Sequence, residues 1–405
     1  MLKLRGITKN VVVLGWVSMF TDIASEMLYP LIPLFVVGPL GGSPALLGVI
    51  EGIAEGVNSG LRWLGGALSD RHQRRKPFII WGYGISAFSK PLIGLAMVFG
   101  WPAVLVGRVS DRFGKSVRSA ARDALIADSV EPQYRGVAFG LHRAMDTAGA
   151  VIGPLIALGV MGFLPWLPLA WLFVIAIIPG ALSVLLAVTA VRDIPHPPSA
   201  TKVKAPPIFQ KFPPVFWHFI AGFAIFSFGK SSDSFLILRS REIFDPAGAN
   251  GHRAMMLVVL AYAIYNLVFV LAAIPLGKLS DKVGRKPVLV GGMLVYAAVY
   301  AGFSYFRSPA APWVLLGAYG IYQALTDGVT KAMATDLVPK EQRAGAIGLF
   351  MAVAGLGQLV GSVVAGAVWQ MQWTNHYLMA PFVIGAACAL AAVPVIATIR
   401  TKAAR

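Results

Sequence analysis

Residues 66–77 read GALSDRHQRRKP, and residues 277–287 read GKLSDKVGRKP. In both stretches glycine, aspartate, basic residues and proline return in the same order, with one more residue in the first copy. A second match supports the repeat, because Asp128 to Arg135 returns 208 residues later as Asp336 to Arg343. Matches at equivalent places in two halves indicate an internal duplication.

The segments between these motifs are apolar and long. Of 405 residues, 57% are apolar and 13% are charged, whereas about a quarter of the residues in a soluble domain are charged. A helix that crosses a bilayer needs about 20 residues, roughly twice the length of a barrel strand, so these segments predict helices. We expect twelve transmembrane helices, at residues 11–37, 45–67, 77–99, 102–126, 136–160, 166–191, 214–238, 254–277, 287–306, 311–335, 344–370 and 376–399.

One proline-rich, basic segment, at residues 192–213, divides the twelve spans into six and six. Proline interrupts helices, and lysine keeps a segment on the cytoplasmic side. We therefore expect an N-terminal six-helix bundle at 1–191, a cytoplasmic linker at 192–213 and a C-terminal six-helix bundle at 214–405.

Membrane topology explains the net charge of +17 better than binding to a nucleic acid does. Most lysines and arginines outside the spans fall in one set of loops, together with both termini, and positive charge resists translocation. Both termini are therefore expected in the cytoplasm. The single cysteine, Cys388, allows no intrachain disulfide and no cysteine cluster for zinc.

The repeated motif resembles the hallmark cytoplasmic motif of the major facilitator superfamily, and the resemblance extends over the whole chain. It implies two pseudo-symmetric six-helix bundles in a bacterial inner membrane, which rock about a central cavity in alternating access. It also implies a cytoplasmic gate, which latches the bundles when the protein faces outward. The gate residues are Gly66, Asp70, Arg71 and Arg74 in the first copy, and Gly277, Asp281, Lys282 and Arg285 in the second.

The fifth span contains Gly149, Gly153 and Pro154, which resemble the glycine–proline motif of antiporters and drug exporters in that superfamily. The resemblance implies export, although small residues four apart can also serve close helix packing alone. The fourth span departs from the drug-exporter pattern, because Asp111 and Arg112 replace the usual glutamine and glycine.

Ionisable residues inside the spans are concentrated in the first half of the chain. Such groups are costly at membrane depth and usually line a cavity or pair with one another. Asp22 and Glu26, four residues apart, share a helix face, and the fourth span carries a charged stripe from Arg108 to Arg122. The resemblance places the first and fourth helices of each half at the cavity.

Two roles are open for these groups. Carboxylates that gain and lose a nearby cation during rocking could carry a coupling proton, and the candidates are Asp22, Glu26, Glu55 and Asp146. Side chains that could contact the solute are Glu51, Lys115, Arg118, Arg122, Asp123, Lys230, Asp233 and Asp327. Arginine and lysine there could instead receive an anion, and a static salt-bridge network is the structural alternative.

We expect a secondary transporter that exports a small organic solute in exchange for protons. The alternatives are a proton-coupled symporter that takes up an organic anion, and a membrane sensor without transport activity. Gly114-Lys115-Ser116 echoes a phosphate-binding loop but lacks its first glycine, because Val109 stands there. No cofactor, metal or enzymatic activity is expected, and the protein is expected to be a monomer.

Overall fold

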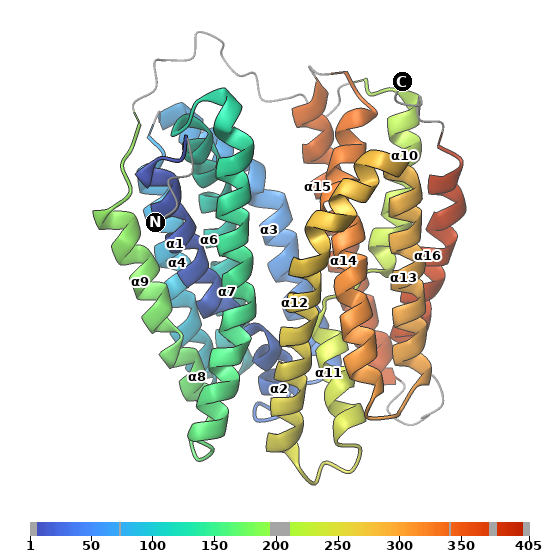
Figure 1. Ribbon diagram of the computed structural model, residues 1–405. Coiled ribbons are helices and arrows are strands. Elements are labelled where there is room, and N and C mark those ends of the chain that lie inside the picture. Colours follow the sequence, from blue (N-terminus) through green and yellow to red (C-terminus); the bar gives the residue numbers. More distant parts are fainter. Residues whose placement is uncertain (1–5, 73, 195–210, 340–341, 372–378, 400–405) are drawn as a thin grey trace. The chain divides into compact units, whose positions relative to one another are not determined.

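The computed structural model describes residues 6–72, 74–194, 211–339, 342–371 and 379–399, without the side chains of 62–72 and 344. All regular secondary structure in these ranges is helical (Figure 1). Each of the twelve predicted spans contains at least one helix. The helices are α1 (Lys9–Glu26), η1 (Tyr29–Leu31), α2 (Ile32–Val37), α3 (Pro44–His72), α4 (Lys76–Gly94), α5 (Ala96–Phe99), α6 (Trp101–Asp128), η2 (Pro132–Tyr134), α7 (Arg135–Phe163), α8 (Leu169–Ile175), α9 (Ile177–Thr189), α10 (Pro214–Gly229), α11 (Ser234–Phe244), α12 (Gly251–Val283), α13 (Arg285–Tyr305), α14 (Ala311–Asp336), α15 (Arg343–Met371) and α16 (Ala380–Ala397).

Four predicted spans are interrupted where the sequence suggested continuous helices, and two of these breaks, at Leu95 and Ala176, are a single residue long. The first is divided between α1 and α2, and Pro30 and Pro33 lie in the turn and the short helix that follow α1. Proline has no N–H to donate to a helix. The seventh span ends as α10 at Gly229 and resumes as α11 at Ser234, around polar residues whose side chains compete for backbone hydrogen bonds.

The second copy of the repeated motif is mostly helical, although most of it lies between the predicted spans 254–277 and 287–306. Helix α12 continues to Val283, and α13 begins at Arg285. Gly284 separates them with φ of +95°, a backbone conformation that glycine adopts without steric cost. The motif is therefore a helix end, one residue of turn and a helix start.

The first compact unit comprises residues 1–41 and 60–202. Within it, α4 packs along α6, α1 packs along α7, and α9 contacts both α1 and α4. Buried apolar side chains of α1, α4 and α6, among them Leu14, Tyr83 and Leu125, form the core near one end of these helices. This packing brings α1, α4 and α6 side by side.

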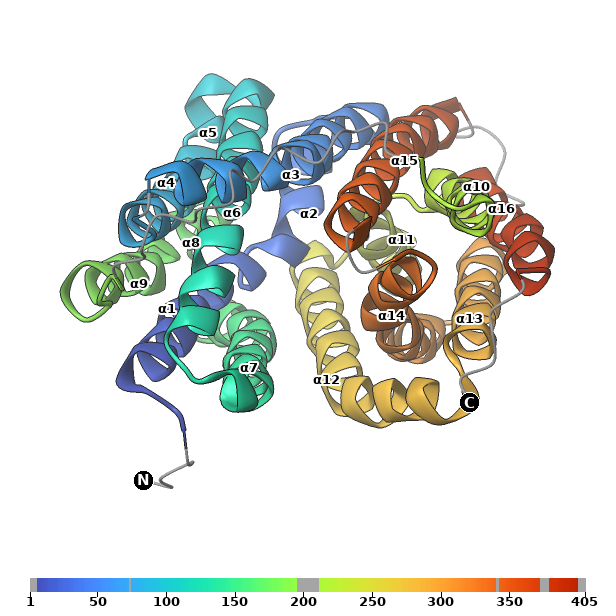
Figure 2. The same ribbon diagram turned by 90° about the horizontal axis from the view of Figure 1, so that it is seen from above.

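The second compact unit comprises residues 42–59 and 203–405. Figure 2 shows α14 in the middle of this unit, in contact with α12 and α13. The first half of α3 packs closely against α15 of this unit. Gly48 makes this close approach possible, because a Cβ there would lie 2.3 Å from the backbone oxygen of Ser362. The predicted bundle limits at residues 191 and 214 stay predictions, since residues 195–210 lie outside the described part.

Seven helical segments among the described residues are long and apolar enough, by composition, to cross a membrane. Helix α6 is not one of them because charged residues recur along its length, and α10 is too short after the break at Gly229. Helix α6, which fails on composition, lines the pocket described below with several of these charged residues.

Candidate functional site

A pocket opens in the first unit between α1, α4 and α6, with about 490 Å³ of empty space including the part open to solvent. It brings together four side chains that the sequence proposed, Asp22, Glu26, Lys115 and Arg118. The lining residues are Asp22, Ser25, Glu26, Leu28, Tyr29, Ile32, Ser89, Lys90, Ile93, Arg108, Asp111, Arg112, Lys115 and Arg118.

The pocket is positively charged. Five of its lining residues are basic and three are acidic, which leaves a formal excess of two positive charges. Within the residues that the structure describes, no group of three His, Cys, Asp or Glu side chains is placed to hold a metal ion. The chemistry of the pocket is therefore that of carboxylates and cationic side chains.

One acid and one base of the pocket neutralise each other. Lys90 Nζ lies 2.7 Å from Asp111 Oδ1, and both side chains are nearly inaccessible to solvent. Lys90 also donates to the backbone oxygen of Ser86 at 2.6 Å, and the Ser86 hydroxyl donates to Asp111. A buried charge keeps its charge only with such partners, so this triad joins α4 to α6.

Two arginines of α6 lie against aromatic rings. The guanidinium carbon of Arg118 is 4.6 Å from the ring centre of Tyr83, and that of Arg108 is 5.4 Å from Tyr29. Gly82 makes the first contact possible, because a Cβ there would lie 2.5 Å from the Cβ of Arg118. Arg118 is 4% exposed, and its buried Nη1 has no hydrogen-bond partner among the described residues.

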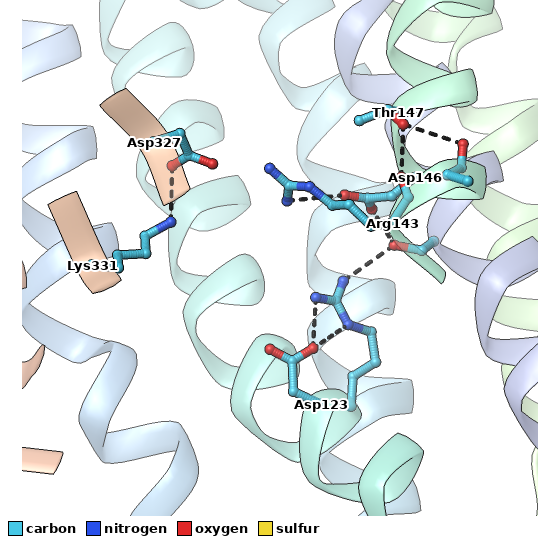
Figure 3. Close-up of polar contacts among 9 residues, drawn as sticks. Asp123, Arg143, Asp146, Thr147, Asp327 and Lys331 are labelled. Atoms are coloured by element: carbon cyan, nitrogen blue, oxygen red, sulfur yellow. Dashed lines mark hydrogen bonds and ion pairs between the residues drawn. The ribbon is translucent and has the colours of Figure 1, made fainter. Parts of the chain in front are cut away.

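Arg122, Asp123 and Asp146 form a network beside the pocket (Figure 3). None of the three lines the pocket, but Asp146 adjoins the lining residue Asp22. Arg122 donates to Asp123 Oδ1 from Nε at 2.9 Å and from Nη2 at 2.8 Å. Its Nη1 donates to Ser18 Oγ at 3.1 Å, and Ser18 donates to Asp146. The network links α1, α6 and α7, while Arg143 lies 3.7 Å from Asp146 on the same helix.

Lys230 and Asp233 flank the break between α10 and α11 in the second unit. Tyr319 donates to Asp233 Oδ1 at 2.7 Å, and Lys230 Nζ lies 5.8 Å from the ring centre of Tyr322. Tyr296 donates to the backbone oxygen of Gly229 at 3.0 Å, which satisfies a carbonyl at the end of α10. Side chains thus replace the helical hydrogen bonds lost at the break.

The predicted acids of α3 lie in the second unit as well. Ser232 Oγ donates to Glu51 Oε2 at 3.2 Å, and Glu51 is buried. Glu55 accepts from Asn58 at 2.9 Å on its own helix. Their proposed parts in solute binding and proton coupling stay predictions.

Asp327 pairs with Lys331 at 2.8 Å, one turn apart on α14 (Figure 3). A spacing of four residues places both side chains on one face of the helix, within reach of each other. Both side chains are partly exposed, so their contact with a solute stays a prediction.

The predicted gate residues can be compared only in part, since the side chains of Gly66, Asp70 and Arg71 lie outside the described residues. In the second copy, Arg285 contacts Asp281 at 2.6 Å and Asp336 at 3.4 Å. Lys282 and Arg74 are exposed, and Gly277 is partly buried.

The two halves share one ion pair at equivalent places. Arg75 of the first copy lies 3.0 Å from Asp128, whose counterpart in the repeat is Asp336, the partner of Arg285. The duplication therefore extends from sequence to contacts.

The glycines of α7 allow it to touch α1. A Cβ on Gly149 would lie 2.5 Å from the backbone oxygen of Met19, and one on Gly153 would lie 2.7 Å from that of Ile23. Pro154 follows within the same helix, which continues to Phe163. The motif therefore packs against the helix that carries Asp22 and Glu26.

Several pocket residues are not among the side chains that the sequence proposed for proton or solute binding. Lys90 and Ser89 of α4 line the pocket together with Tyr29, which follows α1. A lysine inside an apolar span was the available signal for Lys90, since such a group needs a partner or a cavity. No local pattern distinguishes Tyr29 from an aromatic residue that anchors a helix in lipid.

Comparisons with known proteins agree with this fold. The profile of the Major Facilitator Superfamily matches residues 14–244 and 248–404. MJ1317 of Methanocaldococcus jannaschii, an uncharacterised MFS-type transporter, is 35% identical over 367 residues, 91% of this chain and 90% of that one. The multidrug resistance protein MdtH of Escherichia coli O1:K1 is 30% identical over 142 residues, 34% of each chain.

Among solved structures, a mutant of the nucleoside transporter NupG superposes with a TM-score of 0.78 at 16% identity, over 96% of this chain and 99% of that one. This likeness speaks for the fold alone. It confirms the prediction of an all-α membrane protein with twelve transmembrane helices in the major facilitator fold, and the family comprises transporters rather than enzymes. The chain belongs to the major facilitator superfamily of membrane transporters.

Proposed function

We propose that this transporter couples the movement of a small organic anion to protons, and that both bind in the pocket between α1, α4 and α6. The observation that carries the proposal is the composition of that pocket, where Asp22 and Glu26 of α1 lie together with Lys115 and Arg118 of α6. An ionisable group in a membrane-embedded pocket is costly unless a ligand or a partner uses it.

The charge balance favours movement of proton and anion in the same direction. A proton on Asp22 or Glu26 removes a negative charge from a pocket that already has an excess of positive charge. The protonated pocket therefore binds an anion more tightly, and by reciprocity the bound anion favours proton uptake. Two carboxylates one turn apart titrate as a pair, so the proton belongs to both.

Export in exchange for protons is the second candidate. It is supported by Gly149, Gly153 and Pro154, which resemble the motif of antiporters, and by the partial similarity to MdtH, whose name describes multidrug resistance. Exchange requires that solute and proton compete for one site, as a cationic solute and a proton would compete for Asp22 and Glu26.

The setting of this activity is part of the proposal. We place the protein as a monomer in the inner membrane of a bacterium, with both termini in the cytoplasm. The helix ends that contain Asp70 and Asp281 would then lie on the cytoplasmic side, where they would latch the two halves. A cysteine placed at either terminus should react with a membrane-impermeant thiol reagent only in inverted vesicles.

Proteoliposomes that contain a pH-sensitive dye test the coupling. A panel of organic anions and cations is added outside, and uptake of each is measured beside the dye signal. Symport acidifies the lumen when a transported anion is added, whereas antiport makes it more alkaline when a transported cation is added. Transport of a solute without any dye response contradicts proton coupling, and no transport of any solute favours a sensor.

Substitutions test whether Asp22 and Glu26 are required for proton coupling. Asp22→Asn combined with Glu26→Gln should abolish the dye signal, while Glu131→Gln, an exposed carboxylate outside the spans, should leave it unchanged. A double variant with normal coupling removes Asp22 and Glu26 from the mechanism.

A further inference from the structure

We infer that the pocket of the first unit binds a head group with two negative charges on oxygen, such as a phosphate monoester or a dicarboxylate, and that Arg118 determines this specificity. The inference rests on the proposed function only for the location of the solute in this pocket.

The expected charge of the ligand follows from the charge balance of the residues that line the pocket. Lys90 and Asp111 neutralise each other, which leaves Asp22 and Glu26 facing Arg108, Arg112, Lys115 and Arg118. With Asp22 and Glu26 both ionised, two positive charges remain in excess in the part of the pocket that the structure describes. Unbalanced charge in a low-dielectric interior is unfavourable, so a ligand with two negative charges balances the pocket and one with a single charge does not.

The position of Arg118 points to oxygen as the contacting atom. Its guanidinium is held against Tyr83 and packed by Gly82, so its orientation is fixed before a ligand arrives. Nη1 is buried without a hydrogen-bond partner among the described residues, although the side chain is only 4% exposed. A buried donor without an acceptor is costly, and an oxyanion supplies the acceptor in the geometry that guanidinium prefers.

The remaining cations lie along one side of α6. Arg108, Arg112, Lys115 and Arg118 are spaced by four, three and three residues, which places them on one helix face over about 15 Å. Lys115 is exposed and lines the pocket, so its ammonium group is accessible to a ligand. A neutral solute would leave Arg118 unpaired, and an organic cation would be repelled by this face.

Binding to the purified full-length protein tests the inference independently of transport. Thermal stabilisation and isothermal calorimetry are measured with glycerol 3-phosphate, succinate, lactate and tetraphenylphosphonium. We expect one or both of the divalent anions to bind at least about 10-fold more tightly than lactate, and the cation not to bind. Stabilisation by only one divalent anion supports the inference and identifies phosphate or dicarboxylate as the head group.

Arg118→Lys keeps the charge but removes the fork of donors, and it should weaken binding of the divalent anion by about 10- to 100-fold. Arg253→Lys, an exposed arginine at the start of α12, is the matched control and should change nothing. If Arg118→Lys does not fold, Lys115→Gln replaces it, and the preference for divalent over monovalent anions should then decrease.

Three results overturn the inference: equal binding of lactate and the divalent anions, binding of tetraphenylphosphonium, or no binding of any divalent anion. The proposed function can survive each of them, because proton-coupled flux of another solute in proteoliposomes would still be observed. Conversely, binding of a divalent anion without any proton movement would refute the coupling while leaving this inference intact.

Discussion

Replacement of Gly153 by alanine should push α7 away from the helix that carries the candidate proton carriers. The new Cβ would lie 2.7 Å from the backbone oxygen of Ile23 and 2.8 Å from the backbone nitrogen of Met27. Ordinary contact begins at 3.4 Å, and backbone atoms cannot turn aside as a flexible side chain can. Overpacking of this kind costs about 1–3 kcal/mol of stability.

The same substitution at Gly159 provides the control within the same helix. Nothing lies within 4 Å of a Cβ there, so alanine gains helix propensity of up to about 1 kcal/mol without a clash. The two variants should therefore differ by roughly 2–4 kcal/mol, with opposite signs relative to the natural protein.

Thermal unfolding in detergent, followed by intrinsic fluorescence and by size-exclusion chromatography, measures this difference. Gly153→Ala should unfold at a lower temperature than the natural protein, and Gly159→Ala at the same or a higher temperature. Equal midpoints for the two variants would refute the close contact between α1 and α7. A stable Gly153→Ala variant with impaired proton coupling would instead show that the glycine serves transport more than packing.

Further predictions concern polar contacts at different depths. Lys90→Met should destabilise the protein by about 3–5 kcal/mol in thermal unfolding, because Asp111 would stay buried without its partner, and unchanged stability would argue against that pair. Lys331→Met should cost less than about 1 kcal/mol, since its pair with Asp327 is partly exposed, and a larger loss would mean that the pair is buried in the membrane. Tyr319→Phe removes the hydroxyl that donates to the carboxylate at the break between α10 and α11. Transport should decrease with little change in expression, and normal transport would exclude that carboxylate from the cycle.

Local geometry explains which parts of the fold the sequence predicts. Span length and hydropathy are local properties, so each predicted span contains a helix. The break at Lys230 was missed because serine and lysine are tolerated inside helices, and only the contacts of Tyr296 and Asp233 show where the chain leaves the helix. The end of α12 was misplaced because Lys278 and Asp281 are polar, although they continue the helix beyond the apolar segment.

In the candidate site too, relations within one helix could be predicted from the sequence, whereas contacts between helices could not. Spacing of four residues placed Asp22 and Glu26 together, and the stripe on α6 placed Lys115 with Arg118, because these relations are fixed within one helix. The pairing of Lys90 with Asp111 joins residues 21 apart on different helices. Such contacts depend on how helices pack, which one sequence read alone does not specify.

The pair of Lys90 and Asp111 also limits how the first unit can move. Sliding α4 along α6 by one turn, about 5.4 Å, would separate the buried Lys90 ammonium from the buried Asp111 carboxylate and leave both charges unpaired. The buried ion pair therefore fixes the register of these two helices and opposes sliding of one along the other. A shape change during a transport cycle is therefore expected to keep this register, so α4 and α6 move together as one wall of the pocket.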